Sequence, residues 1–216
     1  IIPLSVVFLL LRAQIVRVVL GSGQFDWGQT IVTANTLAFF TFSLLAQSII
    51  PLLARAFFAL RDTWTPFLIG LISSLINIMG GLYFRNILGV SGLALSFSLA
   101  MTVQVVLLWL VLRSRLGTLR ETQLLYSLNK IAFAAMVMSI FMQLLKPPIA
   151  WLVDMTKLWG ILSQGLIIGL SGLAVYLLIC RALRVEELLD FSASLKRRFI
   201  KLKNLERGEI TEADEI

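Results

Sequence analysis

Long apolar runs separated by short polar connections dominate the pattern along this chain. Six runs are each long enough to cross a bilayer, and they cover residues 3–20, 31–53, 66–83, 92–112, 127–145 and 159–180. A helix needs about 20 mostly apolar residues to cross the hydrocarbon core, at about 1.5 Å per residue. Backbone groups in lipid need partners within their own segment, which favours helices, and the alternation typical of an outer-membrane barrel is missing from the sequence. The pattern predicts an all-α, polytopic membrane bundle of six transmembrane helices.

The composition agrees with a chain that lies in lipid. Apolar residues make up 58% of the 216 residues and charged residues 14%, more apolar surface than one soluble core of this size could bury. The sequence has no histidine, one cysteine (Cys180), and no metal-ligand cluster, nucleotide-binding loop, carboxylate pair or nucleophile–base arrangement. We therefore expect no enzymatic activity, no catalytic residue, no metal site and no cofactor.

Lysine and arginine collect in alternate connections between the apolar runs. Fourteen of them lie in one set of connections and in the C-terminal tail, and the opposite set holds Arg85, Lys146 and Lys157. The positive-inside rule then predicts that the basic connections and the C-terminus face the cytoplasm. This distribution explains the net charge of +7 better than binding to nucleic acid does, so we expect no nucleic-acid partner.

The two ends of the chain carry different signals. Apolar and basic residues alternate at helical spacing between residues 185 and 203, a pattern typical of an amphipathic helix on an anionic inner leaflet. Residues 208–216 are acidic and are expected to be disordered. The chain starts directly with a long apolar run, without an initiating methionine or a signal-peptide pattern. It is therefore interpreted as a fragment that lacks an N-terminal part.

One connection carries a motif that points to a known family. Residues 55–66 read Arg-Ala-Phe-Phe-Ala-Leu-Arg-Asp-Thr-Trp-Thr-Pro, which resembles the signature of the lipid II flippases, the MurJ/MviN family of the multidrug/oligosaccharidyl-lipid/polysaccharide exporter superfamily. Residues 21–25 (Gly-Ser-Gly-Gln-Phe) and 90–96 (Val-Ser-Gly-Leu-Ala-Leu-Ser) resemble two further family segments. The resemblance extends through all six runs and corresponds to helices nine to fourteen of a fourteen-helix protein.

The resemblance implies a division of the chain and a function. Residues 1–126 would supply four helices of the second lobe, residues 127–180 two final helices that shape a groove for a polyprenyl tail, and residues 181–216 a cytoplasmic tail. The implied activity is transport of lipid II, a polyprenyl-pyrophosphate-linked glycan, across the bacterial cytoplasmic membrane by alternating access. The implied partners are membrane lipids and the missing N-terminal lobe of the same protein.

The motif residues have two interpretations. Thr65 is a candidate helix cap just before Pro66, which suits the first position of a helix. Arg55, Arg61 and Asp62 form either a cytoplasmic gate that changes partners as the lobes rock, or a positive-inside anchor with a local ion pair.

Arg12 is the candidate substrate-binding residue. In a straight helix it would lie about 13 Å below the outer end, near the middle of the bilayer, where a charged group usually faces a cavity or the interior of the bundle. A pyrophosphate head group would form charge-assisted hydrogen bonds with it. One alternative is a side chain that reaches the membrane surface, which is the favoured interpretation for Arg17. The other is a helix that sits shifted in the membrane.

Two other functions remain open on the sequence. The first is a related flippase for O-antigen or another polyprenyl-linked oligosaccharide, against which the motif at residues 55–66 argues. The second is a membrane scaffold without transport activity that recruits cell-wall enzymes through its basic loops and tail.

Overall fold

The computed structural model describes residues 1–21, 26–117, 121–152 and 158–183, and every element within these ranges is an α-helix. The helices are α1 (Ile2–Leu10), α2 (Arg12–Leu20), α3 (Trp27–Ala59), α4 (Trp64–Leu88), α5 (Val90–Leu116), α6 (Glu121–Leu152) and α7 (Leu158–Ala182). Five are long and apolar enough to cross a membrane, and the count is six if the bent α1–α2 pair forms one span. The prediction of an all-α polytopic membrane bundle is confirmed. The predicted amphipathic and acidic segments of the tail lie outside the described residues.

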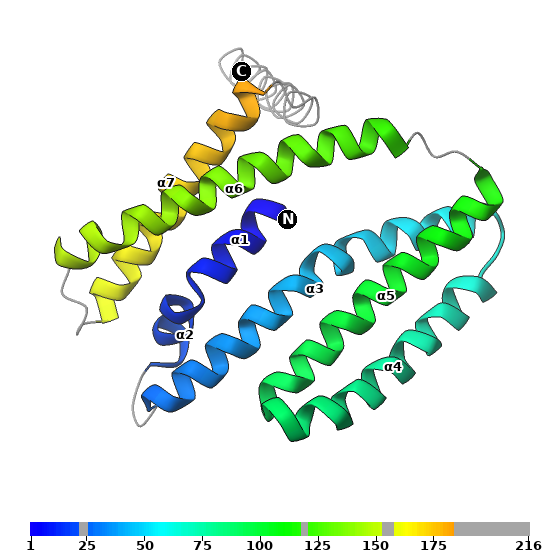
Figure 1. The fold of residues 1–216 in the computed structure, drawn as a ribbon, viewed down its shortest axis with the longest axis horizontal. Helices are drawn as coiled ribbons and strands as arrows, with labels where there is room; N and C mark the ends of the chain where they lie inside the picture. Colours follow the sequence, from blue (N-terminus) through cyan, green and yellow to red (C-terminus); the bar gives the residue numbers. More distant parts are fainter. Residues whose placement is uncertain (22–25, 118–120, 153–157, 184–216) are drawn as a thin grey trace, which may run out of the picture.

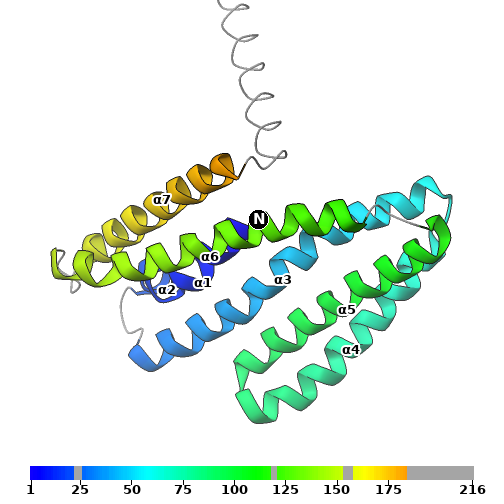
Figure 2. The same ribbon diagram turned by 45° about the horizontal axis from the view of Figure 1, so that its top comes forward.

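The helices form two groups, and the α1–α2 pair lies between them (Figure 1). Helices α3, α4 and α5 pack side by side, and α6 packs along α7. Helices α1 and α2 lie between these groups and contact both of them, α1 through α3, α6 and α7, and α2 through α3 and α7. Among the described residues, no Cα atom of α6 or α7 comes within 8 Å of α3, α4 or α5. The second view shows the same separation between α7 and the α4–α5 pair (Figure 2).

The first span is broken, which the sequence analysis did not predict. Instead of one helix over residues 3–20, α1 and α2 meet at Leu11 with a bend of 71°. The Lys146 ammonium donates a hydrogen bond of 2.6 Å to the backbone carbonyl of Leu10. A cation is favourable at the C-terminal end of a helix, where carbonyl groups lack partners within the helix. Lys146 therefore compensates the broken end of α1.

Small residues let α4 and α5 pack closely. A single residue, Gly89, separates the two helices, and its φ of 61° is a conformation that glycine adopts without strain. A Cβ atom on Gly80 would lie 3.1 Å from Ser96 Cβ, and one on Gly92 would lie 2.3 Å from the Phe84 carbonyl oxygen. α4 and α5 therefore form a tight antiparallel pair, because a side chain at either glycine would separate the helices.

Helix α6 is longer than predicted. The apolar run ends at residue 145, and the sequence analysis assigned Lys146 to an outer connection, but the helix continues through Pro147 and Pro148 to Leu152. Ile149 is buried in the cluster that α6 forms with α7. Each proline removes one backbone donor, and its ring crowds the preceding turn of the helix. Packing of Ile149 therefore helps to hold the helix past both prolines.

Candidate functional site

The polar motif at the α3–α4 connection forms a compact network around Asp62. Its carboxylate accepts hydrogen bonds from the Thr65 amide (3.0 Å) and the Thr65 hydroxyl (2.6 Å). The Arg115 guanidinium, in the last turn of α5, forms an ion pair with Asp62 at 2.5 Å and donates to the Thr65 hydroxyl at 3.2 Å. The network ties the start of α4 to the end of α5.

Electrostatics and packing both favour the charged form of this network. The hydrogen bonds from the Thr65 hydroxyl and amide, with a further contribution from Arg115, lower the pKa of Asp62 from 3.8 to about 2. The Arg115 guanidinium also lies 5.8 Å from the centre of the Phe57 ring, a side chain with no exposed surface, and such a contact is attractive. Asp62 is therefore ionised at any physiological pH.

The start of α4 differs from the prediction. The helix begins at Trp64, so Thr65 is its second residue and Pro66 its third, and Thr65 does not cap the helix. Asp62 takes that role by accepting the Thr65 amide. Pro66 is tolerated because the first backbone N–H groups of a helix have no partner within the helix.

Arg55 and Arg61 do not join the network. Both side chains are exposed, and neither forms an ion pair with a described residue. The sequence analysis placed the local ion pair of Asp62 within the motif, but the structure shows this ion pair with Arg115, at the end of α5. Arg61 instead ends α3 in a left-handed conformation, with a φ of 58°, and the Asp62 amide then donates to the Phe57 carbonyl at 3.0 Å.

Arg12 lies at the break of the first span. It is the first residue of α2 and is half-buried, so the depth expected for a straight helix does not apply to it. Lys146 reaches the same break from α6 by its bond to the Leu10 carbonyl, and the two positive charges act on each other. The Gln164 amide nitrogen donates to the Lys146 carbonyl at 3.4 Å, and its oxygen is buried without a partner among the described residues.

Arg17 lies beyond the break, in the last turn of α2. Its guanidinium carbon lies 5.1 Å from the centre of the Trp27 ring, at the first residue of α3. Asp26 caps that helix, and the Gln29 side chain completes a capping box. Arg17 therefore pairs with an aromatic ring near the α2–α3 connection.

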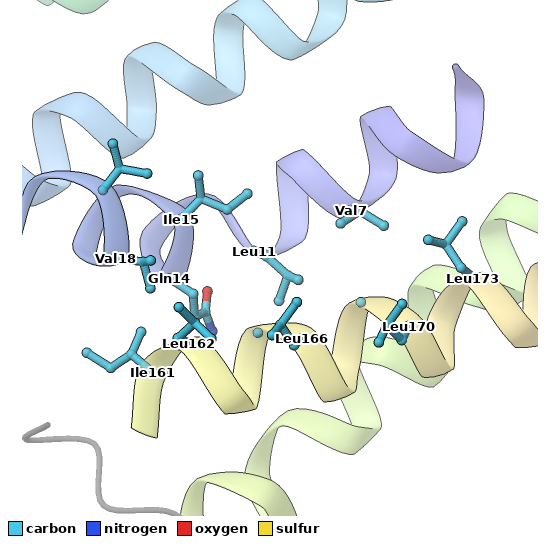
Figure 3. Close-up of a pocket in the computed structure, with 13 residues that line it drawn as sticks. Val7, Leu11, Gln14, Ile15, Val18, Ile161, Leu162, Leu166, Leu170 and Leu173 are labelled. Carbon is cyan, nitrogen blue, oxygen red and sulfur yellow. The ribbon is translucent and has the colours of Figure 1, made fainter. Parts of the chain in front are cut away.

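An apolar cavity of about 420 Å³ lies between the broken span and α7 (Figure 3). Valine, leucine and isoleucine side chains dominate its lining, and Gln14 is its polar member. Gly165 and Gly169 also line it. The figure shows Leu11, the residue at the bend, pointing toward α7. A hydrocarbon chain suits this lining, whereas a charged head group does not.

Comparison with known proteins gives a consistent result. The family profile described as lipid II flippase MurJ matches residues 1–162. A probable lipid II flippase MurJ of Rhizobium meliloti is 32% identical over 139 residues, which cover 63% of this chain and 26% of the relative. The corresponding protein of Thermotoga maritima is 27% identical over 186 residues, which cover 86% of this chain and 36% of the relative.

A solved structure extends the similarity to three dimensions. The chain matches a lipid II flippase MurJ in an inward closed conformation with a TM-score of 0.66 and 26% identity. The match covers 87% of this chain and 36% of the solved chain. This chain therefore spans about a quarter to a third of the length of these relatives.

Proposed function

The chain belongs to the lipid II flippase MurJ family, and on that premise we propose that it forms the C-terminal part of a flippase for lipid II. The complete protein would move this lipid-linked peptidoglycan precursor across the bacterial cytoplasmic membrane by alternating access. The observation that carries the proposal is the match of the family profile to residues 1–162. The shared helical arrangement supports it.

The division into two helix groups supports a moving assembly. Helices α3–α5 contact α6 and α7 only through α1 and α2 among the described residues, so the two groups can tilt relative to each other without breaking a direct interface. Hinge motions of this kind are typical of alternating access. In the proposed cycle, the Asp62–Thr65–Arg115 network is a gate contact. The exposed Arg55 and Arg61 would face the other lobe of the protein.

The apolar cavity supports a role in holding the polyprenyl tail. Its lining comes from α1, α2 and α7. A hydrocarbon chain that binds there is stabilised by removal from water and by close van der Waals contacts with the lining. The proposed tail site therefore involves α7, one of the two final helices to which the family resemblance assigns the groove, together with the broken span.

The orientation in the membrane is part of the proposal. The α3–α4 connection and the end of α5 lie at the same end of the bundle, because Asp62 pairs with Arg115. Both regions belong to the basic set, which the positive-inside rule assigns to the cytoplasm. The C-terminal tail would then be cytoplasmic and contact the anionic inner leaflet.

The test is translocation of lipid II in a bacterial strain depleted of its own flippase. The full-length protein that contains this segment should restore growth and lipid II translocation, whereas the 216-residue segment alone should not, because alternating access needs both lobes. Loss of translocation in the Asp62→Arg and Arg115→Asp variants, with recovery in the double variant, would support the gate contact.

A matched control separates the gate from a general charge effect. Arg85 lies in the last turn of α4, at the other end of the helix, and Arg85→Ala should leave translocation unchanged. Restoration by the isolated segment, or no translocation by the full-length protein, contradicts the proposed function. Rescue of a strain defective in O-antigen export, without rescue of lipid II translocation, identifies the alternative substrate.

A further inference from the structure

The break between α1 and α2 brings two cations together from distant parts of the chain. Lys146 lies in α6, and its ammonium contacts the Leu10 carbonyl at 2.6 Å, 136 residues away in sequence. Arg12, two residues after Leu10, is the first residue of α2. Both side chains are half-buried, and their charges act on each other. Two like charges at one place in a membrane-spanning bundle repel each other unless an anion lies near them.

No described acidic side chain neutralises this pair. Asp26 caps α3 beyond the far end of α2, and Asp62 is engaged with Arg115 at the α3–α4 connection. Neither carboxylate is described in contact with Arg12 or Lys146. Within the described part of the chain, the charges of Arg12 and Lys146 are therefore not offset by a carboxylate.

The backbone at the break adds to the positive potential. No side chain caps α2, and its first turn contains no acidic residue. The N-terminal end of a helix presents free N–H groups and the positive end of the helix dipole. On the other side of the break, Lys146 already satisfies one carbonyl at the end of α1. The charges and dipoles at the break thus favour an anion.

We propose that Arg12 and Lys146 form a binding site for a phosphate or pyrophosphate group at the broken span. Arg12 would bind two phosphate oxygens through its planar guanidinium, and Lys146 would add a point charge. The site rests on the proposed function for its ligand, the pyrophosphate of a polyprenyl-linked substrate. It deepens that function by adding Lys146 and by placing the site at the helix break.

The test is direct binding to the full-length protein in lipid nanodiscs. The probes are farnesyl pyrophosphate, inorganic pyrophosphate and farnesol, followed by isothermal titration calorimetry. Arg12→Gln and Lys146→Gln should each weaken binding of farnesyl pyrophosphate by about tenfold or more, because each removes a charge-assisted hydrogen bond. Lys146→Arg should retain most of the affinity. Farnesol should bind equally to all variants.

Arg17→Gln is the matched control, since Arg17 lies on the same helix but contacts Trp27. Its affinity for farnesyl pyrophosphate should equal that of the unchanged protein. If Lys146→Gln does not fold, because the Leu10 carbonyl loses its partner, Arg12→Gln and Lys146→Arg still decide the question. Unchanged affinity in a folded Arg12→Gln variant overturns the proposal.

The probes also separate the possible sources of the phosphate group. Much tighter binding of farnesyl pyrophosphate than of inorganic pyrophosphate identifies a lipid head group as the ligand, whereas equal affinities identify a site for free phosphate compounds. Both results support the site. If the protein translocates lipid II but binds the probes independently of Arg12, the proposed function stands and the proposed site is wrong. If it binds the probes through Arg12 but does not translocate lipid II, the site stands and the proposed function is wrong.

Discussion

Replacing Gly172 by alanine tests how closely α6 and α7 pack. A Cβ atom at this position would lie 2.6 Å from Met142 Cγ and 2.7 Å from Met142 Sδ, about 1 Å inside the ordinary contact distance between carbon atoms. Met142 has no exposed surface, so its side chain cannot move without displacing its neighbours. Overpacking of this kind costs about 1–3 kcal/mol, and the better helix propensity of alanine offsets about 0.5–1 kcal/mol. We expect a net loss of about 1–2 kcal/mol of unfolding free energy.

The measurement is unfolding of the purified protein in mild detergent by titration with a denaturing detergent. Gly165→Ala is the control, because its Cβ atom would lie 3.9 Å from Gln14 Cβ, an ordinary contact; its stability should be unchanged or slightly higher. In a Met142→Ala background the cost of Gly172→Ala should disappear, since both clashing atoms are gone. Wild-type stability of Gly172→Ala, or an equal loss in the Met142→Ala background, would refute the close packing.

Three further predictions concern the α3–α4 connection and the orientation of the chain. Asp62→Asn should lower the thermal unfolding midpoint at pH 7. The pKa of Asp62 in the folded protein is lowered from 3.8 to about 2, so its stabilising effect is complete above pH 3.8 and is lost as the pH falls through about 2. Scanning fluorimetry should therefore show the unfolding midpoints of the wild-type and Asp62→Asn proteins converging in that range. Arg61→Gly should match or exceed wild-type stability and Arg61→Val should fall below it, because φ is 58°; a stable valine variant would contradict this conformation. In a Cys180→Ala background, an impermeant thiol reagent should reach Ser22→Cys but not Ser194→Cys, two positions outside the described residues; the reverse labelling would overturn the topology.

The positions of the spanning helices could be predicted from the sequence because each depends on local hydropathy. Every predicted run lies within a described helix or, for the first run, within the α1–α2 pair and the Leu11 between them. The bend at Leu11 could not be predicted, since the residues before it are apolar and the group that compensates it, Lys146, lies in another helix. The extension of α6 past Pro147 could not be predicted for a related reason. Proline weakens a helix locally, and the burial of Ile149 that outweighs it depends on a cluster formed with other parts of the chain.

For the candidate residues, too, local contacts could be predicted from the sequence and contacts between distant helices could not. The closeness of Asp62 and Thr65 follows from a separation of three residues. Arg115 lies 50 residues from Thr65, and a basic residue at the end of an apolar run has an ordinary explanation in membrane topology. Only the close pairing of α4 and α5 brings its side chain to the motif. The roles of Arg55 and Arg61 remain predictions.

The position of α1 and α2 between two helix groups has a consequence for biosynthesis. Helices α3, α4 and α5 follow them directly in the chain and can pack as they emerge from the ribosome, but α6 and α7 come last. At about 5–20 residues per second, roughly 6–25 s pass between synthesis of α2 and of Lys146. During that interval the Leu10 carbonyl and its neighbouring arginine lie in the membrane without the lysine that later compensates the break. Insertion of the last hairpin is therefore the step that completes the first span, because it brings Lys146 to the Leu10 carbonyl.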